Sequence, residues 1–150
     1  MVCPKRFPGH LVLLASLFLL CAGAHVQAET PMDRAWEKLE KAFKKLKDGL
    51  QEPKDSQKTT YQALVETMLA ESARIREMSP QMTKTLPPDQ QAAFLEEFKK
   101  EMDEFAGHLN ALKAAVDGSQ WETARQEMSA LGSTKKPAHK KFRVENYKGP

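Results

Sequence analysis

The chain has 150 residues, is 41% hydrophobic and carries a formal net charge of +3 at pH 7. Lys5 and Arg6 supply two of these positive charges and precede the first acidic residue, Glu29, so the chain from Glu29 onward has a formal charge of +1 (+3 minus 2). Its cations and anions alternate at helical spacing, as Glu37 and Lys41 do, which is typical of a solvated surface. Nothing in this charge pattern supports binding to nucleic acid.

The first 28 residues have the pattern of a secretory signal peptide. Lys5 and Arg6 form its positive region, residues 11–20 are an apolar run too short to span a membrane, and Ala28 precedes the expected cleavage point. The alternative is a lipoprotein cleaved before Cys21, for which Leu20 is a poor preceding residue. We therefore expect cleavage after Ala28, a periplasmic location in a bacterium, and one domain over residues 29–150.

Both cysteines, Cys3 and Cys21, lie in the expected signal peptide. The mature chain is therefore expected to have no disulfide, no thiolate metal site and no covalent C-x-x-C-H haem attachment. Its 122 residues (150 minus 28) are enough for one domain with its own core. No nucleophile, base and orienting group occur in a recognisable arrangement, so we expect no enzyme.

Four amphipathic segments predict helices over residues 31–50, 56–79, 88–117 and 119–145. The first begins with the capping pair Thr30 and Asp33 around Pro31. Ser79-Pro80 ends the second, because a proline disfavours helix at the residue before it. Apolar residues recur in these two helices at gaps of three and four, which indicates a bundle seam: Met32, Trp36, Leu39, Phe43, Leu46 and Leu50, then Tyr61, Val65, Met68 and Ile75, with the small polar Ser72 among them.

The last two helices are joined by a short turn. Gly118 is a helix stop, and Ser119 with Glu122 predicts a capping box for the final helix, whose middle is weakened by Gly132 and Pro137. Their apolar faces consist of Phe94, Phe98, Met102, Phe105, Leu109, Leu112 and Val116, then Trp121, Ala124, Met128, Leu131, Ala138 and Phe142. Short connections make neighbouring helices antiparallel, so we predict an all-α, up-down-up-down antiparallel four-helix bundle. No segment of the mature chain predicts a membrane span.

Two histidines, His108 and His139, are the candidate ligands of the mature chain. His139 shares a helix face with Gly132, Lys135 and Phe142, and the glycine leaves room beside the imidazole. The alternative for His139 is a surface histidine at a solvated basic helix end. His108 flanks the seam of its helix and is expected to be partly exposed and paired with a carboxylate, Glu104 being four residues before it. Methionines on the seams are expected to fill the core.

The end of the chain resembles the cytochrome b562 family and the wider group that includes the cytochromes c-prime. The resemblance is carried by the sequence A-H-K-K-F-R at residues 138–143, the signal peptide, the four helices and the turn at Gly118. Thr134, His139, Phe142 and Arg143 also match the closing pattern of the cytochromes c-prime, as does Gly132. Lys135 and Ala138 replace the two haem-binding cysteines of that pattern. The resemblance therefore implies non-covalent haem b.

In this family the histidine near the C-terminus and a methionine early in the first helix are the axial haem ligands. The resemblance assigns the first role to His139. The seam places Trp36 or Leu39 at the methionine position, and Met32 lies one turn, about 5.4 Å, nearer the start of the helix. Three outcomes stay open: Met32 ligates after a shift, the iron is five-coordinate with His139 facing Trp36 and Leu39, or no haem binds.

The resemblance also implies the remaining cofactor contacts. Phe98, Met102 and Phe142 would pack against the porphyrin, and Lys135 and Arg143 would meet its propionates. The expected function is that of a periplasmic haem-b electron-transfer protein that exchanges electrons with periplasmic redox partner proteins. The alternative is a haem-free helical bundle that kept the fold and acts as a binding or structural protein, which the missing methionine and Pro137 beside His139 favour.

Overall fold

The computed structural model describes residues 30–142, except for the side chains of Lys136 and His139. This part of the chain is all-helical and contains no strand, which confirms the predicted all-α class. Its helices are α1 (Pro31–Gly49), α2 (Lys58–Arg76), α3 (Pro88–Asp117) and α4 (Trp121–Phe142), with short 3-10 helices at Asp55–Gln57 and Gln81–Thr85. The expected signal peptide and Arg143 lie outside the described residues.

Most helix boundaries fall close to the prediction, with two differences. α2 begins at Lys58 and ends at Arg76, because residues 55–57 form a 3-10 turn and the chain leaves the helix before Pro80. α4 begins at Trp121, two residues later than predicted, and its predicted end at residue 145 lies outside the described residues.

The start of α1 is capped as predicted. The Thr30 hydroxyl accepts a hydrogen bond from the Asp33 backbone N–H at 3.1 Å, and the Asp33 carboxylate accepts one from the Thr30 N–H at 3.0 Å. This reciprocal pair satisfies backbone donors that the first helical turn leaves unpaired.

The turn between α3 and α4 differs from the prediction. Ser119 has a φ of 52°, in the left-handed region, whereas Gly118 has an ordinary φ of −84°. The N–H groups of Ser119 and Gln120 donate to the carbonyls of Val116 (3.0 Å) and Ala115 (2.8 Å). This is the Schellman pattern, with the serine in the position that glycine usually fills. The predicted capping box of Ser119 and Glu122 is therefore wrong.

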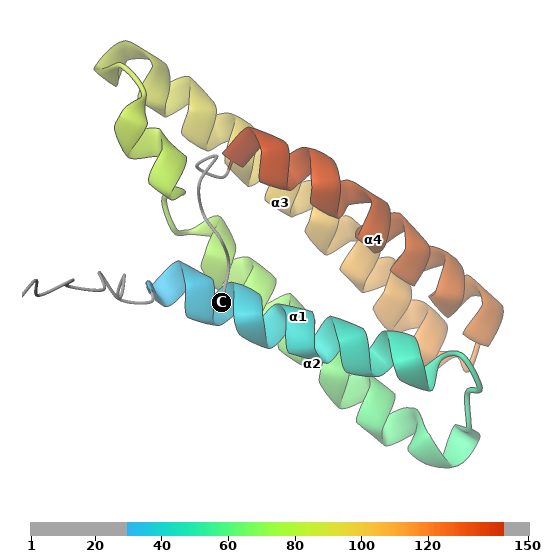
Figure 1. Ribbon diagram of the computed structural model, residues 1–150. Helices are drawn as coiled ribbons and strands as arrows, with labels where there is room; N and C mark the ends of the chain where they lie inside the picture. Colours follow the sequence, from blue (N-terminus) through green and yellow to red (C-terminus); the bar gives the residue numbers. More distant parts are fainter. Residues whose placement is uncertain (1–29, 143–150) are drawn as a thin grey trace, which may run out of the picture.

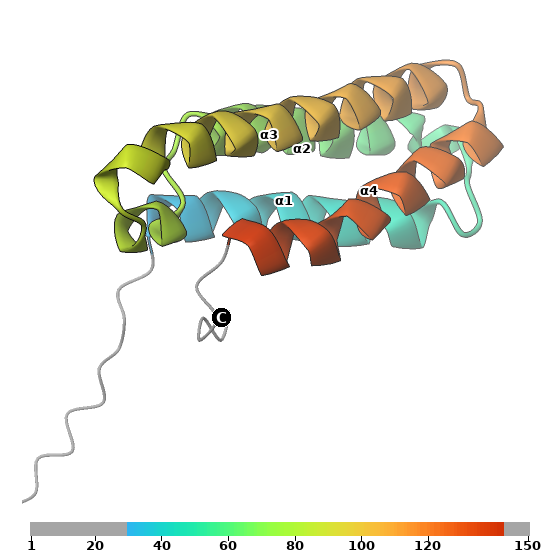
Figure 2. The ribbon, with the colours of Figure 1, turned by 90° about the horizontal axis from the view of Figure 1, so that it is seen from above.

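The four helices lie side by side along one long direction (Figure 1). In Figure 1, α1 lies in front of α2 and α4 lies in front of α3, and in the view from above α4 runs obliquely to α1 (Figure 2). Consecutive helices pack closely, whereas α1 and α4 touch only sparsely. None of the described helices is long and apolar enough to cross a membrane.

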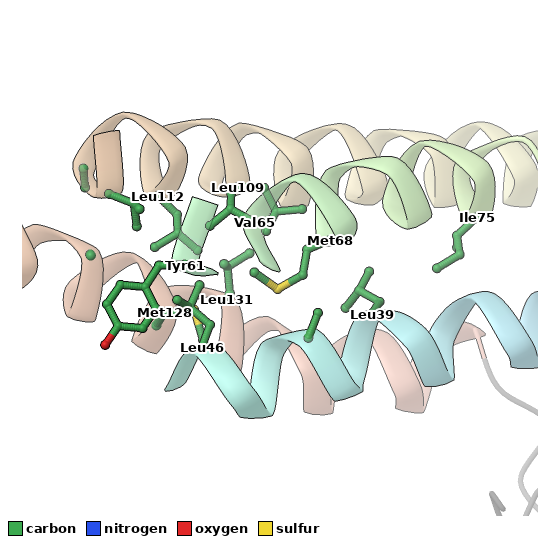
Figure 3. Close-up of a cluster of buried hydrophobic side chains, with 14 of the residues drawn as sticks. Leu39, Leu46, Tyr61, Val65, Met68, Ile75, Leu109, Leu112, Met128 and Leu131 are labelled. Atoms are coloured by element: carbon green, nitrogen blue, oxygen red, sulfur yellow. The ribbon is translucent and has the colours of Figure 1, made fainter. Parts of the chain in front are cut away.

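Side chains from all four helices fill the core (Figure 3). Met68, Met102 and Met128 are buried in it, as predicted from their seam positions, whereas Met32 is only partly buried. Ser72 is also buried, and its hydroxyl donates to the Leu69 carbonyl at 2.9 Å, so the one polar seam residue is satisfied within its own helix. The largest fully buried side chains are Leu46, Leu50, Met68, Ile75, Leu109, Leu112, Leu131, Val65 and Val116.

Candidate ligand cavity

The character of α4 changes halfway along its length. In its first half, Ala124, Met128 and Leu131 are at most 4% exposed. Between Leu131 and Phe142 the described residues of α4 that line the cavity are small or polar: Gly132, Thr134, Lys135 and Ala138. A Cβ atom added at Gly132 would lie 3.7 Å from Cζ at the tip of the Phe43 ring, so the Phe43 side chain of α1 spans the gap to α4 at this point. Beyond it, the short side chains leave the space between the helices unfilled.

A cavity of about 220 Å³ lies between α1, α3 and the second half of α4. It occupies the end of the molecule where α1 begins and α4 ends. Its walls are largely apolar and aromatic, and carboxylates stand at its edges. The apolar lining residues are Met32, Trp36, Leu39, Phe43, Phe98, Met102, Phe105, Leu131, Ala138 and Phe142. Because ligand pockets commonly measure about 300–1,000 Å³, a large ligand would require α4 to move outward.

Seven of the nine site residues predicted from the sequence have described side chains, and all seven line this cavity: Met32, Trp36, Leu39, Phe98, Met102, Lys135 and Phe142. His139 lies in α4, but its side chain is outside the described part, and Arg143 is outside it altogether. The structure thus brings the predicted residues together. Their role as cofactor contacts stays a prediction.

The register of α1 against α4 determines which residue stands opposite His139. Gly132 lies beside Phe43, and Lys135 forms an ion pair with Glu40. Four residues after Lys135 in α4 is position 139, and four residues before Glu40 in α1 is Trp36. Position 139 therefore lies level with Trp36 rather than with Leu39. Met32 is one further turn away, about 6 Å along the axis of α1. A thioether bond from Met32 to an iron at position 139 would therefore need α1 to shift.

An aromatic cluster closes the outer end of the cavity. The Phe142 ring centroid lies 5.2 Å from that of Phe98 and 5.3 Å from that of Phe94, with the rings tilted toward each other. Phe142 is 8% exposed, so this contact removes the last described residue of α4 from water. Edge-on ring pairs of this kind add modestly to the burial of apolar area. The cluster therefore anchors the end of α4 over the cavity.

The cations at the cavity edge already have protein partners. Lys135 pairs with Glu40, and the Lys141 ammonium lies 2.7 Å from Glu97 and 3.2 Å from Glu101 on α3. The hydrogen bond to Glu97 is the main cause that raises the pKa of Lys141 above its ordinary value. Because exposed ion pairs contribute little free energy, Lys135 can exchange Glu40 for an anionic group of a ligand.

His108 also lines the cavity, and its partner differs from the prediction. Its Nδ1 lies 2.8 Å from a carboxylate oxygen of Glu127 on α4, whereas Glu104 faces Lys100 at 4.0 Å. The expectation of a partly exposed histidine paired with a carboxylate is confirmed, but the carboxylate is Glu127 rather than Glu104. The sequence pattern missed it because Glu127 is 19 residues away on the next helix.

The lining suits a porphyrin in its chemistry. Flat aromatic and thioether side chains form the walls, and Met32 and Met102 are thioethers of the kind that bind haem iron. Among the described side chains there is no group of three or more His, Cys, Asp or Glu residues that could hold a bare metal ion. Haem needs only one or two axial ligands, so its fit depends on single donors and on the apolar walls.

Comparison with known proteins identifies no relative. No family model, no curated protein and no solved structure matches the chain.

Proposed function

We propose that this chain is an exported haem-b-binding electron-transfer protein of cytochrome b562 type, with the haem held non-covalently in the cavity. The observation that supports this proposal is the convergence of residues from α1, α3 and α4 on one apolar cavity. Seven of the predicted site residues are among them. The protein acts in the periplasm after cleavage at Ala28, performs no catalysis of its own, and passes electrons to redox partner proteins.

The proposed topology is an up-down-up-down antiparallel bundle. Polar contacts between side chains of neighbouring helices support it. The Gln62 side chain donates to Asp117 at 2.8 Å, Arg76 donates to Asp103 at 2.6 Å, and Lys141 contacts Glu97. Moving forward along α2 from Gln62 to Arg76 moves backward along α3 from Asp117 to Asp103, as antiparallel neighbours require, and Lys141 near the end of α4 meets Glu97 in the first half of α3.

Each lining residue has a defined task in this proposal. His139 would hold the haem iron through a neutral imidazole nitrogen, and Met32 would be a second ligand only if α1 shifted by a turn; otherwise Trp36 and Leu39 would line the side of the haem away from His139. Phe98, Met102 and Phe142 exclude water, while Lys135 and Arg143 face the propionates. Bound haem supplies a one-electron couple at its iron, and the protein sets the ligands and the surrounding dielectric.

A haemin titration of the purified chain tests this function. We expect a shifted, sharpened Soret band that saturates at one haemin per chain, and we expect His139→Ala to abolish it. His108→Ala is the comparison, because His108 is the other histidine of the expected mature chain and also lines the cavity; a band lost in His108→Ala but kept in His139→Ala would place the ligand at His108 instead. A flat titration of the unmutated chain would reject the proposal.

The second candidate is a haem-free bundle that binds another apolar ligand in the same cavity. Two observations favour it: Trp36 stands level with position 139, where the family has methionine, and Lys135 is engaged by Glu40. Stoichiometric iron in protein purified from its native periplasm would reject this candidate.

A further inference from the structure

The two halves of α4 are held in place very differently. The first half is anchored in the core through Ala124, Met128 and Leu131, all nearly inaccessible to solvent. It also carries the Glu127 contact to His108 and a hydrogen bond of 3.2 Å from the Arg125 guanidinium to the Leu50 carbonyl. Buried contacts and cross-helix bonds of this kind give a segment high local stability.

The second half of α4, residues 133–142, has far fewer anchors. Among its described side chains, only Phe142 is buried, and Ala138 is partly buried. Lys135 and Pro137 are exposed. With so little buried apolar area, this half should separate from the rest of the molecule at low cost, while the first half stays in place.

The junction between the halves is the weakest point of the helix. Gly132 is exposed and has the lowest helix propensity of any residue except proline. Pro137, inside the second half, has no N–H to donate to the carbonyl one turn earlier. The break in apolar packing, the glycine and the proline therefore occur in one short stretch.

Exposed ion pairs hold the second half on both sides of the cavity. Lys135 joins it to Glu40 of α1, and Lys141 joins it to Glu97 and Glu101 of α3. Lys135 is exposed and Lys141 is partly exposed, so salt screens these pairs and each contributes little. They are suited to a closure that holds at low ionic strength and releases readily.

We propose that residues 133–142 form a lid over the cavity, which opens about Gly132 and admits the ligand. The lid is closed by Phe142 and by the ion pairs of Lys135 and Lys141. The inference rests on the proposed function only in taking the cavity as the binding site, and it applies whether the occupant is haem or another apolar molecule.

Hydrogen exchange measured by mass spectrometry on the free protein tests the lid without any ligand. We expect amides in 133–142 to exchange at least about tenfold faster than amides in 122–131, because local opening exposes only the first group. Equal protection of both halves would overturn the proposal.

Lys141→Met tests the closure while keeping the apolar stem of the side chain. We expect exchange in 133–142 to accelerate about two- to fivefold at low salt, as expected for the loss of two exposed ion pairs. Added NaCl should accelerate exchange in the unmutated protein more than in this variant. Lys113→Met is the matched control, since Lys113 also makes two ion pairs, with Glu66 and Asp117 at the α2–α3 interface, and should leave the lid unchanged.

The rate of haemin association separates the lid from the proposed function. If Lys141→Met accelerates both exchange and haemin association, the lid controls access. If exchange accelerates but no haemin binds to either protein, the lid stands and the haem proposal fails. If haemin binds at the same rate in both proteins, or if exchange in 133–142 is unchanged in Lys141→Met, the lid is rejected while the haem proposal stands or falls on its own titration.

Discussion

Filling the cavity from α4 should stabilise the protein and weaken ligand binding at the same time. Ala138 is partly buried and lines the cavity wall one turn before Phe142. Leucine at this position adds three carbon atoms, and full burial would contribute about 2 kcal/mol at about 0.8 kcal/mol for each. Because the site is only partly buried, we expect the free energy of unfolding of Ala138→Leu to rise by about 1 kcal/mol.

Urea unfolding followed by circular dichroism measures the first effect, and haemin titration the second. We expect the affinity for haemin to fall at least about tenfold, since the added side chain occupies the space of the ligand and about 1.4 kcal/mol corresponds to a factor of ten. Ala111→Leu, at an exposed position of α3 outside the cavity, is the control and should change stability by less than about 0.5 kcal/mol. If Ala138→Leu lowers the free energy of unfolding, the cavity beside Ala138 is too small to hold the leucine side chain. Unchanged haemin affinity would show that the ligand binds elsewhere.

Three further predictions concern stability. Gly132→Ala should raise the unfolding free energy by about 1 kcal/mol from helix propensity, because the new Cβ meets Phe43 at an ordinary 3.7 Å; thermal melting checks it, and a lower melting temperature would contradict it. Ser119→Gly should also stabilise, by about 1 kcal/mol, because Ser119 has a φ of 52°; an unchanged urea midpoint would show that this turn is not strained. Hydrogen bonding to Arg76 lowers the pKa of Asp103 in the folded protein. The stability that the ionised Asp103 contributes is therefore present above the ordinary Asp pKa and is lost as the pH falls through the pKa of Asp103 in the folded state. Asp103→Asn should therefore lower the urea midpoint at pH 7 and flatten its decline below about pH 4; a parallel decline in both proteins would contradict this.

The four helices were predictable because each seam repeats over several turns. Apolar residues at gaps of three and four, from Met32 to Leu50 for example, admit only a helix with one buried face. The capping pair at the start of α1 was also readable, since all its atoms come from adjacent residues. The turn after α3 was not, because the order Gly118-Ser119 does not say which residue takes the left-handed position. The packing of α4 against α3 determines that Ser119 takes this position.

Many of the residues that line the cavity could be predicted from the sequence, but the volume of the cavity could not. The short side chains at Gly132 and Ala138 indicate space, yet its volume depends on how far α4 stands from α1, which is set by packing over the whole molecule. The partner of His108 was unpredictable for the same reason. Glu127 reaches it only because α3 and α4 pack in one particular register.

The central claim, that the cavity holds haem through His139, is tested most directly by one absorption spectrum. Equimolar haemin is added to the purified chain, and the spectrum is recorded before and after reduction. The account predicts a Soret band that moves on reduction, together with resolved α and β bands, all lost in His139→Ala. A spectrum identical to that of free haemin would contradict it.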